Sequence, residues 1–427
     1  MMPRILDTPT RGDTAHSPAK ASPAEPDPPT HPIRVLIVDT AIAFGGTLAV
    51  ARNLLKHLDP GLIDASLVSA CSDGFVSSGF AGKAQVRLLA PRVDYVTLQN
   101  WKQAIRRRFR WAPLRRSLEL TAMGTEFLAN IPYVIHLVRI CRKMRIQVLH
   151  ANNFAMEPIW AARLLGIPIV NHLHGFLYTP LERSRTRNFR HVNAFVSISR
   201  AVTESALGSG IDHARIHDIP NFVEQTPVCP PPPLPTEPAI GIFGRVTQWK
   251  GQREFICAAL EALPKHPKLR LDIVGDASDT DPRYMDECKL IAESSPFSAQ
   301  IEFTGMVTDV TAYYKRCTAV VHASIEPEPF GMVLIEAMAL GRPVVASIYG
   351  AAPEIIRDGI EGFLVDPHDT STMAARICEL LADPALAMRM GSAGCERVRS
   401  EYDPRAAARK FERLYIGLAK SGTPRMR

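Results

Sequence analysis

The chain has 427 residues, of which 46% are hydrophobic and 22% charged, and its formal net charge is +7. This length is enough for two or three domains with cores of their own, and the composition excludes a fibrous or wholly disordered protein. Proline is unusually frequent, because eight prolines lie in residues 1–32 and seven in residues 227–238. We therefore expect globular domains with a proline-rich tail and a stiff, proline-rich linker.

The sequence also favours a cytoplasmic protein. Residues 1–32 lack the apolar segment of a signal peptide, and the most apolar long stretch, 118–140, is interrupted by charged residues. The eight cysteines are scattered without a CxxC pair, which predicts reduced thiols and no structural zinc.

Short apolar runs alternate with amphipathic stretches from Ile33 onward. Six runs of strand length precede the linker, at 33–38, 62–70, 86–90, 147–151, 168–174 and 194–199. Runs that are apolar on both faces and separated by helices indicate a parallel sheet covered on both sides. The segments 72–85 and 91–125 match no motif, and we expect them to be loops.

The same alternation begins again after the linker. Strands are expected at 239–244, 269–275, 299–305, 318–324, 343–347 and 362–367, and helices at 251–262, 332–340, 370–382 and 384–398. The fold class is therefore α/β, with two doubly wound domains that face a cleft, and ligands bind at the carboxyl ends of the strands in such sheets. A final helix, 404–418, has one apolar face and is expected to pack back on the first domain.

These patterns divide the chain into five parts. We predict a disordered tail, a first domain, a linker, a second domain, and a C-terminal helix with its tail, at residues 1–32, 33–225, 226–238, 239–400 and 401–427, respectively.

A cluster of cations lies in residues 101–116. Seven lysines and arginines occur there without an acidic residue, and Trp101, Phe109 and Trp111 lie among them. This mixture favours an anionic membrane surface, where aromatic rings lie at the level of the headgroups. A solvated helix face is the alternative interpretation; nucleic acid is a third and is not expected as a partner.

The segment GRVTQWKG, residues 244–251, follows a strand and opens a helix. Its glycines allow the backbone to approach a ligand closely, and Arg245 and Lys250 supply positive charge. A helix N-terminus adds free N–H donors, so this turn suits a phosphate group. Taken alone, Arg245 and Lys250 are better explained as solvated loop residues.

A second informative segment spans residues 324–347. Glu328 follows a strand, Gly331 begins a helix, and Glu336 falls in the second turn of that helix. The free N–H groups of residues 330–333 are donors that face the cleft, and an upstream carboxylate can accept from sugar hydroxyls. If either glutamate stood alone, Glu328 would be a charge that complements the helix dipole and Glu336 a surface residue.

Together these segments resemble the retaining nucleotide-sugar glycosyltransferases of the two-Rossmann (GT-B) fold, in particular family four, the group 1 glycosyltransferases. The resemblance covers about residues 33–402 and is strongest over 241–367. Its marker is a Glu-x7-Glu pair, matched by Glu328 and Glu336 in EPFGMVLIEAMALGRPVVAS. The glycine loop at 44–46 and the histidine before Gly175, which is His174, also match the family.

The resemblance implies an acceptor domain followed by a donor domain, and it assigns the site residues. The implied catalytic residues are His174, Arg245, Lys250 and Glu328. The implied donor-binding residues are Gly45, Gly46, Gly244, Arg245, Lys250, Gly275, Glu328, Phe330, Gly331, Met332, Val333 and Glu336.

The activity implied is transfer of a hexose from a UDP- or GDP-sugar to a glycan or lipid-linked acceptor, with retention of anomeric configuration, in cell-envelope or exopolysaccharide synthesis. No cofactor is expected: the cations can replace a metal at the leaving diphosphate. The enzyme is expected in the cytoplasm, with peripheral contact to the inner face of the membrane through 101–116. A glycoside phosphorylase, a nucleotide-sugar epimerase and a non-catalytic nucleotide-sugar-binding subunit remain alternatives.

The sequence departs from the family pattern at three places. Phe222 follows Asn221 where the family has glycine, Gly350 is followed by alanine rather than a second glycine, and Trp249 is bulky for its position. None of these changes removes a charged residue of the site, so we interpret them as adjustments of donor or acceptor binding.

Overall fold

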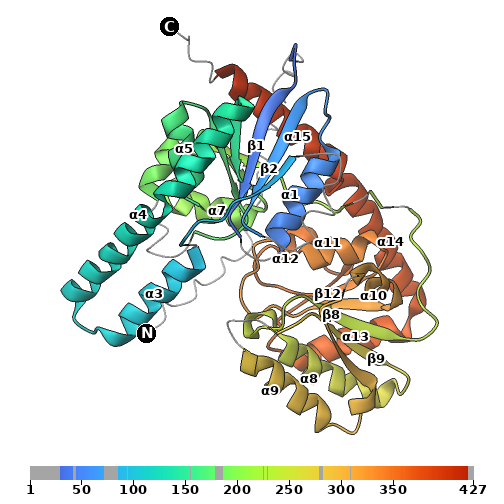
Figure 1. Cartoon of the computed structure of the whole chain (residues 1–427). Coiled ribbons are helices and arrows are strands. Elements are labelled where there is room, and N and C mark those ends of the chain that lie inside the picture. The colour runs from blue at the N-terminus through green and yellow to red at the C-terminus, as the bar shows by residue number, and fades with distance from the viewer. Residues whose placement is uncertain are drawn as a thin grey trace, which may run out of the picture.

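Two parallel β-sheets flanked by helices organise the chain (Figure 1). The computed structural model describes residues 29–41, 45–71, 85–93, 95–153, 155–177, 186–224, 226–227, 229–277, 282–307 and 309–421. The expected tail up to residue 28, Phe44 and most of the expected loop 72–85 lie outside the described residues. The predicted class, a doubly wound α/β architecture with two Rossmann-like units, is confirmed.

The first sheet has seven parallel strands. In spatial order they are β3 (Gln85–Leu88), β2 (Ile63–Ser69), β1 (Ile33–Asp39), β4 (Val148–Ala151), β5 (Ile169–Leu173), β6 (Ala194–Ser197) and β7 (Ile216–Asp218). The chain moves outward from β1 to β3 and then returns to β4 beside β1, so the carboxyl ends of β1 and β4 form the switch point where such sheets bind ligands. The short edge strand β7 was not predicted, because its residues are half-buried or exposed and form no apolar run.

The helices of the first unit cover both faces of this sheet. They are α1 (Gly46–His57), α3 (Tyr95–Arg108), α4 (Ala112–Met144), α5 (Glu157–Leu165) and α7 (Arg200–Gly208), with short 3-10 turns at η1 (Thr186–His191) and η2 (His213–Arg215).

The expectation of a loop at 91–125 is wrong, because most of this segment is helical. Helix α4 has 33 residues, and its buried positions recur every three or four residues only from Ala122 onward. None of its first ten residues is buried, so this part of the helix shows no apolar periodicity. Asn130 ties α4 to the segment before α3: its side chain accepts from Val93 N (3.0 Å) and donates to Val93 O (2.8 Å).

The second sheet has six parallel strands. In spatial order they are β10 (Ile301–Gly305), β9 (Arg270–Val274), β8 (Ala239–Phe243), β11 (Ala319–His322), β12 (Val344–Ser347) and β13 (Gly362–Val365). Its helices are α8 (Gln252–Ala262), α9 (Pro282–Glu293), α10 (Val310–Arg316), α11 (Met332–Ala339), α12 (Ala352–Ile355), α13 (Thr370–Ala382) and α14 (Pro384–Glu401), with 3-10 turns at η3 (Gln248–Lys250), η4 (Leu263–Lys265) and η5 (Ser298–Gln300). Here the switch point lies between β8 and β11.

The last helix, α15 (Pro404–Ser421), packs on the first unit as predicted. Figure 1 shows it beside α1, and its apolar face joins the buried cluster formed by α1 and β1. Tyr415 Oη lies 2.6 Å from Nδ1 of His150 in β4, and Glu412 accepts a 2.7 Å hydrogen bond from Asp59 N. The chain therefore crosses back to the first sheet after completing the second sheet.

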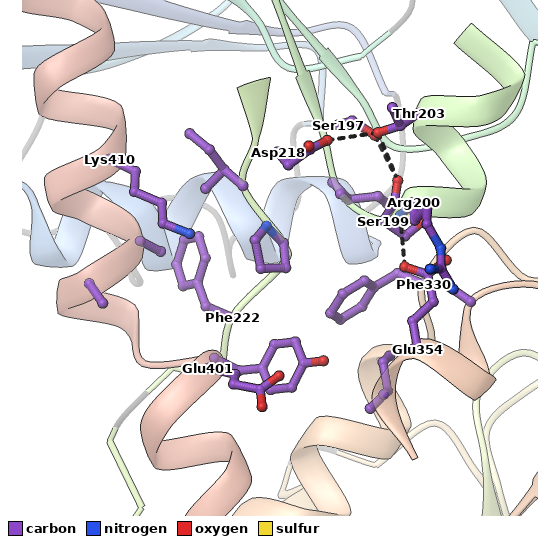
Figure 2. A pocket seen from close by; sticks show the side chains of 18 of the residues that line it. Ser197, Ser199, Arg200, Thr203, Asp218, Phe222, Phe330, Glu354, Glu401 and Lys410 are labelled. Carbon is purple, nitrogen blue, oxygen red and sulfur yellow. Dashed lines mark hydrogen bonds between the residues drawn. The ribbon is translucent and has the colours of Figure 1, made fainter. Parts of the chain in front are cut away.

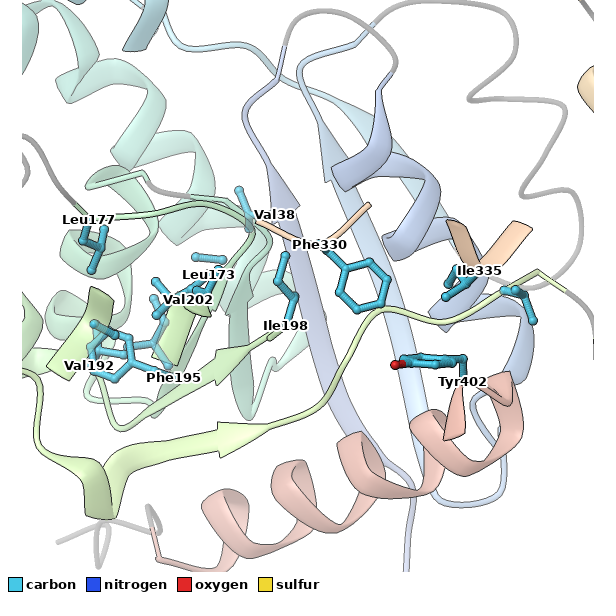
Figure 3. Close-up of a cluster of buried hydrophobic side chains, with 14 of the residues drawn as sticks. Val38, Leu173, Leu177, Val192, Phe195, Ile198, Val202, Phe330, Ile335 and Tyr402 are labelled. Atoms are coloured by element: carbon cyan, nitrogen blue, oxygen red, sulfur yellow. The ribbon is translucent and has the colours of Figure 1, made fainter. Parts of the chain in front are cut away.

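One buried apolar cluster extends across both units (Figure 3). It joins Val38 and Ile198 of the first unit to Phe330 and Ile335 of the second, and Tyr402 at the end of α14 also belongs to it. Within the described part of the chain, no helix is both long enough and apolar enough to cross a membrane.

Candidate active site

The turn after β8 carries the two cations singled out in the sequence. Gly251 ends this turn with φ +71°, and a Cβ there would lie 1.9 Å from Ala323 O, so only glycine fits the close approach. The backbone of the turn is bonded to the next loop, because Ile325 N donates to Trp249 O at 2.9 Å. Arg245 is exposed, whereas the ammonium group of Lys250 lies over the Trp249 ring, 4.2 Å from its centroid.

Glu328 lies on the loop that follows β11, and its backbone position is fixed by Gly350. Ala351 N donates to Glu328 O at 2.9 Å, and a Cβ on Gly350 would lie 2.3 Å from Glu328 N and O. Gly350 also has φ +74°, so both the close contact and the backbone conformation require glycine. The glycine before the PE sequence is therefore used to place Glu328.

The Glu328 carboxylate brings three side chains together. Lys250 Nζ donates to Oε1 at 2.5 Å, and Oε2 accepts from His322 Nε2 at 2.5 Å and from Ser324 Oγ at 2.9 Å. Burial alone would raise the pKa of Glu328, but the attraction of His322 and then of Lys250, with their hydrogen bonds, outweighs it and holds this pKa well below its usual range. Glu328 is therefore ionised at neutral pH.

Helix α11 begins immediately after this carboxylate. Gly331, with φ +100°, precedes its first turn, and no side chain caps the N–H groups there. Met332 packs against the cluster that contains α1, so the start of α11 lies next to the first unit. The Glu336 carboxylate, one turn further on, accepts a 2.9 Å hydrogen bond from Tyr314 Oη, and burial raises its pKa.

On the side of the first sheet, His174 lies just beyond β5. Its Nε2 is 3.4 Å from Asn152 Oδ1, and the Asn152 amide donates to Asp39 Oδ2 (2.7 Å) and to Thr47 O (2.9 Å). Asn152 thus joins the ends of β1, β4 and β5 to the first turn of α1, where Gly45 and Gly46 lie. Burial lowers the pKa of His174 to about 3, so its ring is neutral at neutral pH.

The two edges meet at the start of α7, and Figure 2 shows Ser199 and Arg200 of this helix start near Phe330 and Glu354 of the second unit. Ser199, the N-cap residue of α7, donates to Pro329 O at 2.7 Å, directly beside Glu328. Across the same boundary, Glu354 accepts from the backbone N–H groups of Arg200 (2.7 Å) and Ala201 (2.8 Å). A pocket of about 550 Å³ lies here between the two units. Phe330 lines it, and its ring lies against that of Tyr402, with the ring centroids 5.9 Å apart.

The remaining predicted glycines line strand ends. Gly275 has φ +140°, and a Cβ on it would lie 2.0 Å from Gly244 O, so the turns after β8 and β9 touch through their backbones. Among the described residues, no group of three or more His, Cys, Asp or Glu side chains is placed to hold a metal ion.

The buried partners of the predicted residues were not predicted from the sequence. His322 and Ser324 lie at the end of β11, and Asn152 follows β4. Each is a polar residue at the carboxyl end of a strand that is otherwise apolar, and that pattern could have identified them. Their particular partners depend on strand order, which the sequence did not give.

The charge on Glu328 predicts a pH dependence of stability. Because its pKa in the folded protein lies below the ordinary value of 4.5, ionised Glu328 contributes stability above about pH 4.5, and this contribution is lost as the pH falls. In urea unfolding, the wild type should lose stability relative to Glu328→Gln below pH 4.5, by up to about 1.4 kcal/mol per pH unit.

The matched control is Glu326→Gln, an exposed position in the same loop. If the free energies of unfolding of wild type and Glu328→Gln differ by the same amount from pH 7 to pH 3, the Glu328 carboxylate is not stabilised in its ionised form as described.

Comparisons with known proteins identify the family of the chain. The family model for glycosyl transferases group 1 matches residues 231–397, and the model for glycosyltransferase family 4 matches residues 44–226. The chain is 31% identical over 323 residues to the lipopolysaccharide core biosynthesis mannosyltransferase LpcC of Rhizobium leguminosarum bv. viciae, covering 71% of this chain and 89% of the relative. It is also 31% identical over 297 residues to the phosphatidyl-myo-inositol mannosyltransferase of Mycobacterium leprae, covering 64% and 74%.

Solved structures show the same fold. The Anabaena protein Alr3699/HepE in complex with UDP and glucose superposes with a TM-score of 0.72 at 19% identity, covering 90% of this chain and all of that one. A glycosyltransferase from Rickettsia africae superposes with a TM-score of 0.69 at 18% identity, covering 91% and 99%. The chain therefore belongs to the group 1 glycosyltransferases of family 4 and has their two-unit GT-B fold.

Proposed function

We propose that this glycosyltransferase moves a hexose from a UDP- or GDP-sugar to a glycan or lipid-linked acceptor in cell-envelope or exopolysaccharide synthesis. The observation that carries the proposal is the arrangement of Arg245, Lys250 and Glu328 beside the start of α11. The names of the relatives support the acceptor class, since one acts in lipopolysaccharide core synthesis and another on phosphatidyl-myo-inositol. The solved complex of HepE with UDP and glucose supports a nucleotide-sugar donor.

The proposed donor site follows from charge. Cleavage between the anomeric carbon and the diphosphate builds negative charge on the leaving oxygen, which Arg245, Lys250 and the N–H groups at residues 331–333 would stabilise. This set of donors would serve without a divalent metal. Gly244 and Gly275 let the backbone approach the diphosphate, and Glu336 would bind hydroxyls of the nucleoside.

Retention is proposed to occur by attack on the same face of the sugar. The oxygens of Glu328 already accept hydrogen bonds from three side chains, which makes this carboxylate a poor nucleophile. The acceptor oxygen would form its bond to the anomeric carbon as the bond to the diphosphate breaks, and the acceptor proton would pass to the leaving phosphate oxygen. Neutral His174, whose Nε2 lies near Asn152, would orient the sugar through Nδ1.

The first unit also carries a surface that suits a membrane. Helices α3 and α4 project from the rest of the molecule as a hairpin (Figure 1). Exposed arginines lie around the turn of this hairpin, at 106–108, 110 and 116, and Trp111 among them is 68% exposed. Further along α4, Leu120, Leu128, Ile131 and Ile135 are exposed on one face of the helix. Lys102, which the sequence analysis counted with these cations, is buried and does not belong to the surface.

We propose that this hairpin docks on an anionic membrane and so brings the site to lipid-linked acceptors. Each exposed arginine would contribute about 1 kcal/mol near such a surface, and the apolar face of α4 would add contact with the acyl boundary.

The donor proposal predicts a specific loss of activity. Purified wild type should release UDP or GDP from a matching nucleotide-sugar, and keep this activity in EDTA. Arg245→Ala should lower kcat/KM by about tenfold to a hundredfold, because it removes a charged contact to the diphosphate.

Arg270→Ala is the matched control, since Arg270 is an exposed arginine of the same unit. It begins β9 and so lies at the amino ends of the strands, away from the proposed site. Consumption of inorganic phosphate instead of nucleotide release would indicate a glycoside phosphorylase. Activity lost in EDTA and restored by Mg²⁺ or Mn²⁺ would contradict metal independence.

The membrane proposal predicts that the protein binds vesicles that contain phosphatidylglycerol and does not bind vesicles of phosphatidylcholine alone. Replacing Arg107 and Arg108 together with alanine should weaken sedimentation with anionic vesicles by about thirtyfold, because about 2 kcal/mol of attraction is lost. The attraction should also weaken as salt rises, since screening shortens its range.

Arg389→Ala combined with Arg405→Ala removes the same charge from exposed positions elsewhere and should leave vesicle binding unchanged. Equal binding to both vesicle types, or to neither, would contradict the docking proposal.

A further inference from the structure

The two oxygens of Glu328 have different kinds of partners. Oε2 accepts hydrogen bonds from His322 and Ser324, which are 4% and 0% exposed, respectively. Oε1 is bonded to Lys250, whose side chain reaches it from the turn after β8. One oxygen is therefore held from within the core, and the other by a flexible side chain from a loop.

The core side of this arrangement is rigid. His322 is the last residue of β11, which pairs with β8 and β12 on either side. Ser324 Oγ also lies 3.2 Å from His322 Nε2, so the three groups converge on one point. Because an ionised carboxylate only accepts hydrogen bonds, His322 carries a proton on Nε2 in this contact.

The loop side must change when a nucleotide-sugar binds. A diphosphate carries more negative charge than one carboxylate, and Lys250 stands on the turn proposed to receive it. If Lys250 were the only partner of Glu328, its movement would leave a buried carboxylate without compensation, which is costly. Two hydrogen bonds to Oε2 keep the ionised form stable after Lys250 leaves.

We infer that His322 and Ser324 are positioning residues of the donor site: they hold Oε2 of Glu328 so that Lys250 can pass from Oε1 to the donor diphosphate and leave Oε1 free to accept from a sugar hydroxyl. This inference rests on the proposed donor site. It assigns to the end of β11 a role in setting both the charge and the orientation of Glu328.

The test compares variants that keep or remove the N–H donor. His322→Ala should lower kcat/KM for the nucleotide-sugar by about tenfold to a hundredfold and weaken UDP binding, because Lys250 stays with Glu328. Its acid limb in the pH profile of kcat/KM should move upward, since Glu328 loses the partner that contributes most to its low pKa. His322→Gln should restore most of kcat/KM and of the UDP affinity, because its amide N–H can reach Oε2. It should restore the acid limb only in part, because the amide replaces the hydrogen bond but not the electrostatic attraction of His322.

Ser324→Ala makes a smaller change in the same place and should lower kcat by about threefold to tenfold. His266→Gln is the control and should behave as wild type. His266 lies in the turn before β9, at the amino ends of the strands and away from the proposed site. Thermal unfolding of each variant shows whether it is folded, and if His322→Ala does not fold, His322→Gln and Ser324→Ala are compared with Glu328→Gln instead.

An unchanged acid limb and unchanged UDP affinity in a folded His322→Ala, or a loss in Ser324→Ala no larger than in His266→Gln, would overturn the inference. These results are distinct from failure of the proposed function, in which the wild type itself releases no nucleotide from any UDP- or GDP-sugar.

Discussion

The buried charge of Glu328 constrains the whole carboxyl edge of the second sheet. A carboxylate at that depth is stable only with close partners, and two segments supply them: the turn with Lys250 and the end of β11 with His322 and Ser324. A third segment holds the backbone of Glu328, because Ala351 N, next to Gly350, donates to Glu328 O. The glycines of this region follow from the same constraint, because side chains at 251 and 350 would separate the segments that must touch. In an α/β sheet these loops lie together only because the strands they follow are neighbours. The order of the strands in the sheet therefore determines which residues meet at the site.

The same edge is coupled to the first unit. The residue after Glu328, Pro329, accepts from Ser199 at the start of α7, and Glu354 receives two N–H groups of that helix across the boundary. On the first sheet, Asn152 links His174, Asp39 and the turn that opens α1. Movement of one unit against the other would therefore change contacts directly beside Glu328. Helix α15 crosses between the units and anchors on His150, which gives the second unit a further tether to the first.

Much of the fold could be predicted from the sequence, because buried parallel strands are continuous apolar runs and twelve such runs are separated by helical patterns or turns. Glu328 and Glu336 were singled out because the segment that carries them resembles the Glu-x7-Glu marker of the family; each residue alone would have been interpreted as a helix-dipole charge or a surface residue. Residues 95–144 were less predictable. Most positions of α3 and of the first turns of α4 are not buried, so the sequence there lacks the apolar periodicity that indicates a helix. The role of the residue at 322 was not predictable, because a histidine at a strand end has a partner only once β11 is known to lie beside β8. The burial of Lys102 was not predictable either, because it lies in a basic cluster and no local pattern distinguishes it from its exposed neighbours.

A crystal structure with a nucleoside diphosphate bound tests the central claim most directly. The account predicts the diphosphate over Gly244 and the N–H groups at the start of α11, contacted by Arg245 and Lys250, with Glu336 at the nucleoside. It also predicts that Lys250 has left Oε1 of Glu328 while His322 and Ser324 remain on Oε2. A nucleotide bound elsewhere, or one bound here with Lys250 still on Glu328, would contradict it.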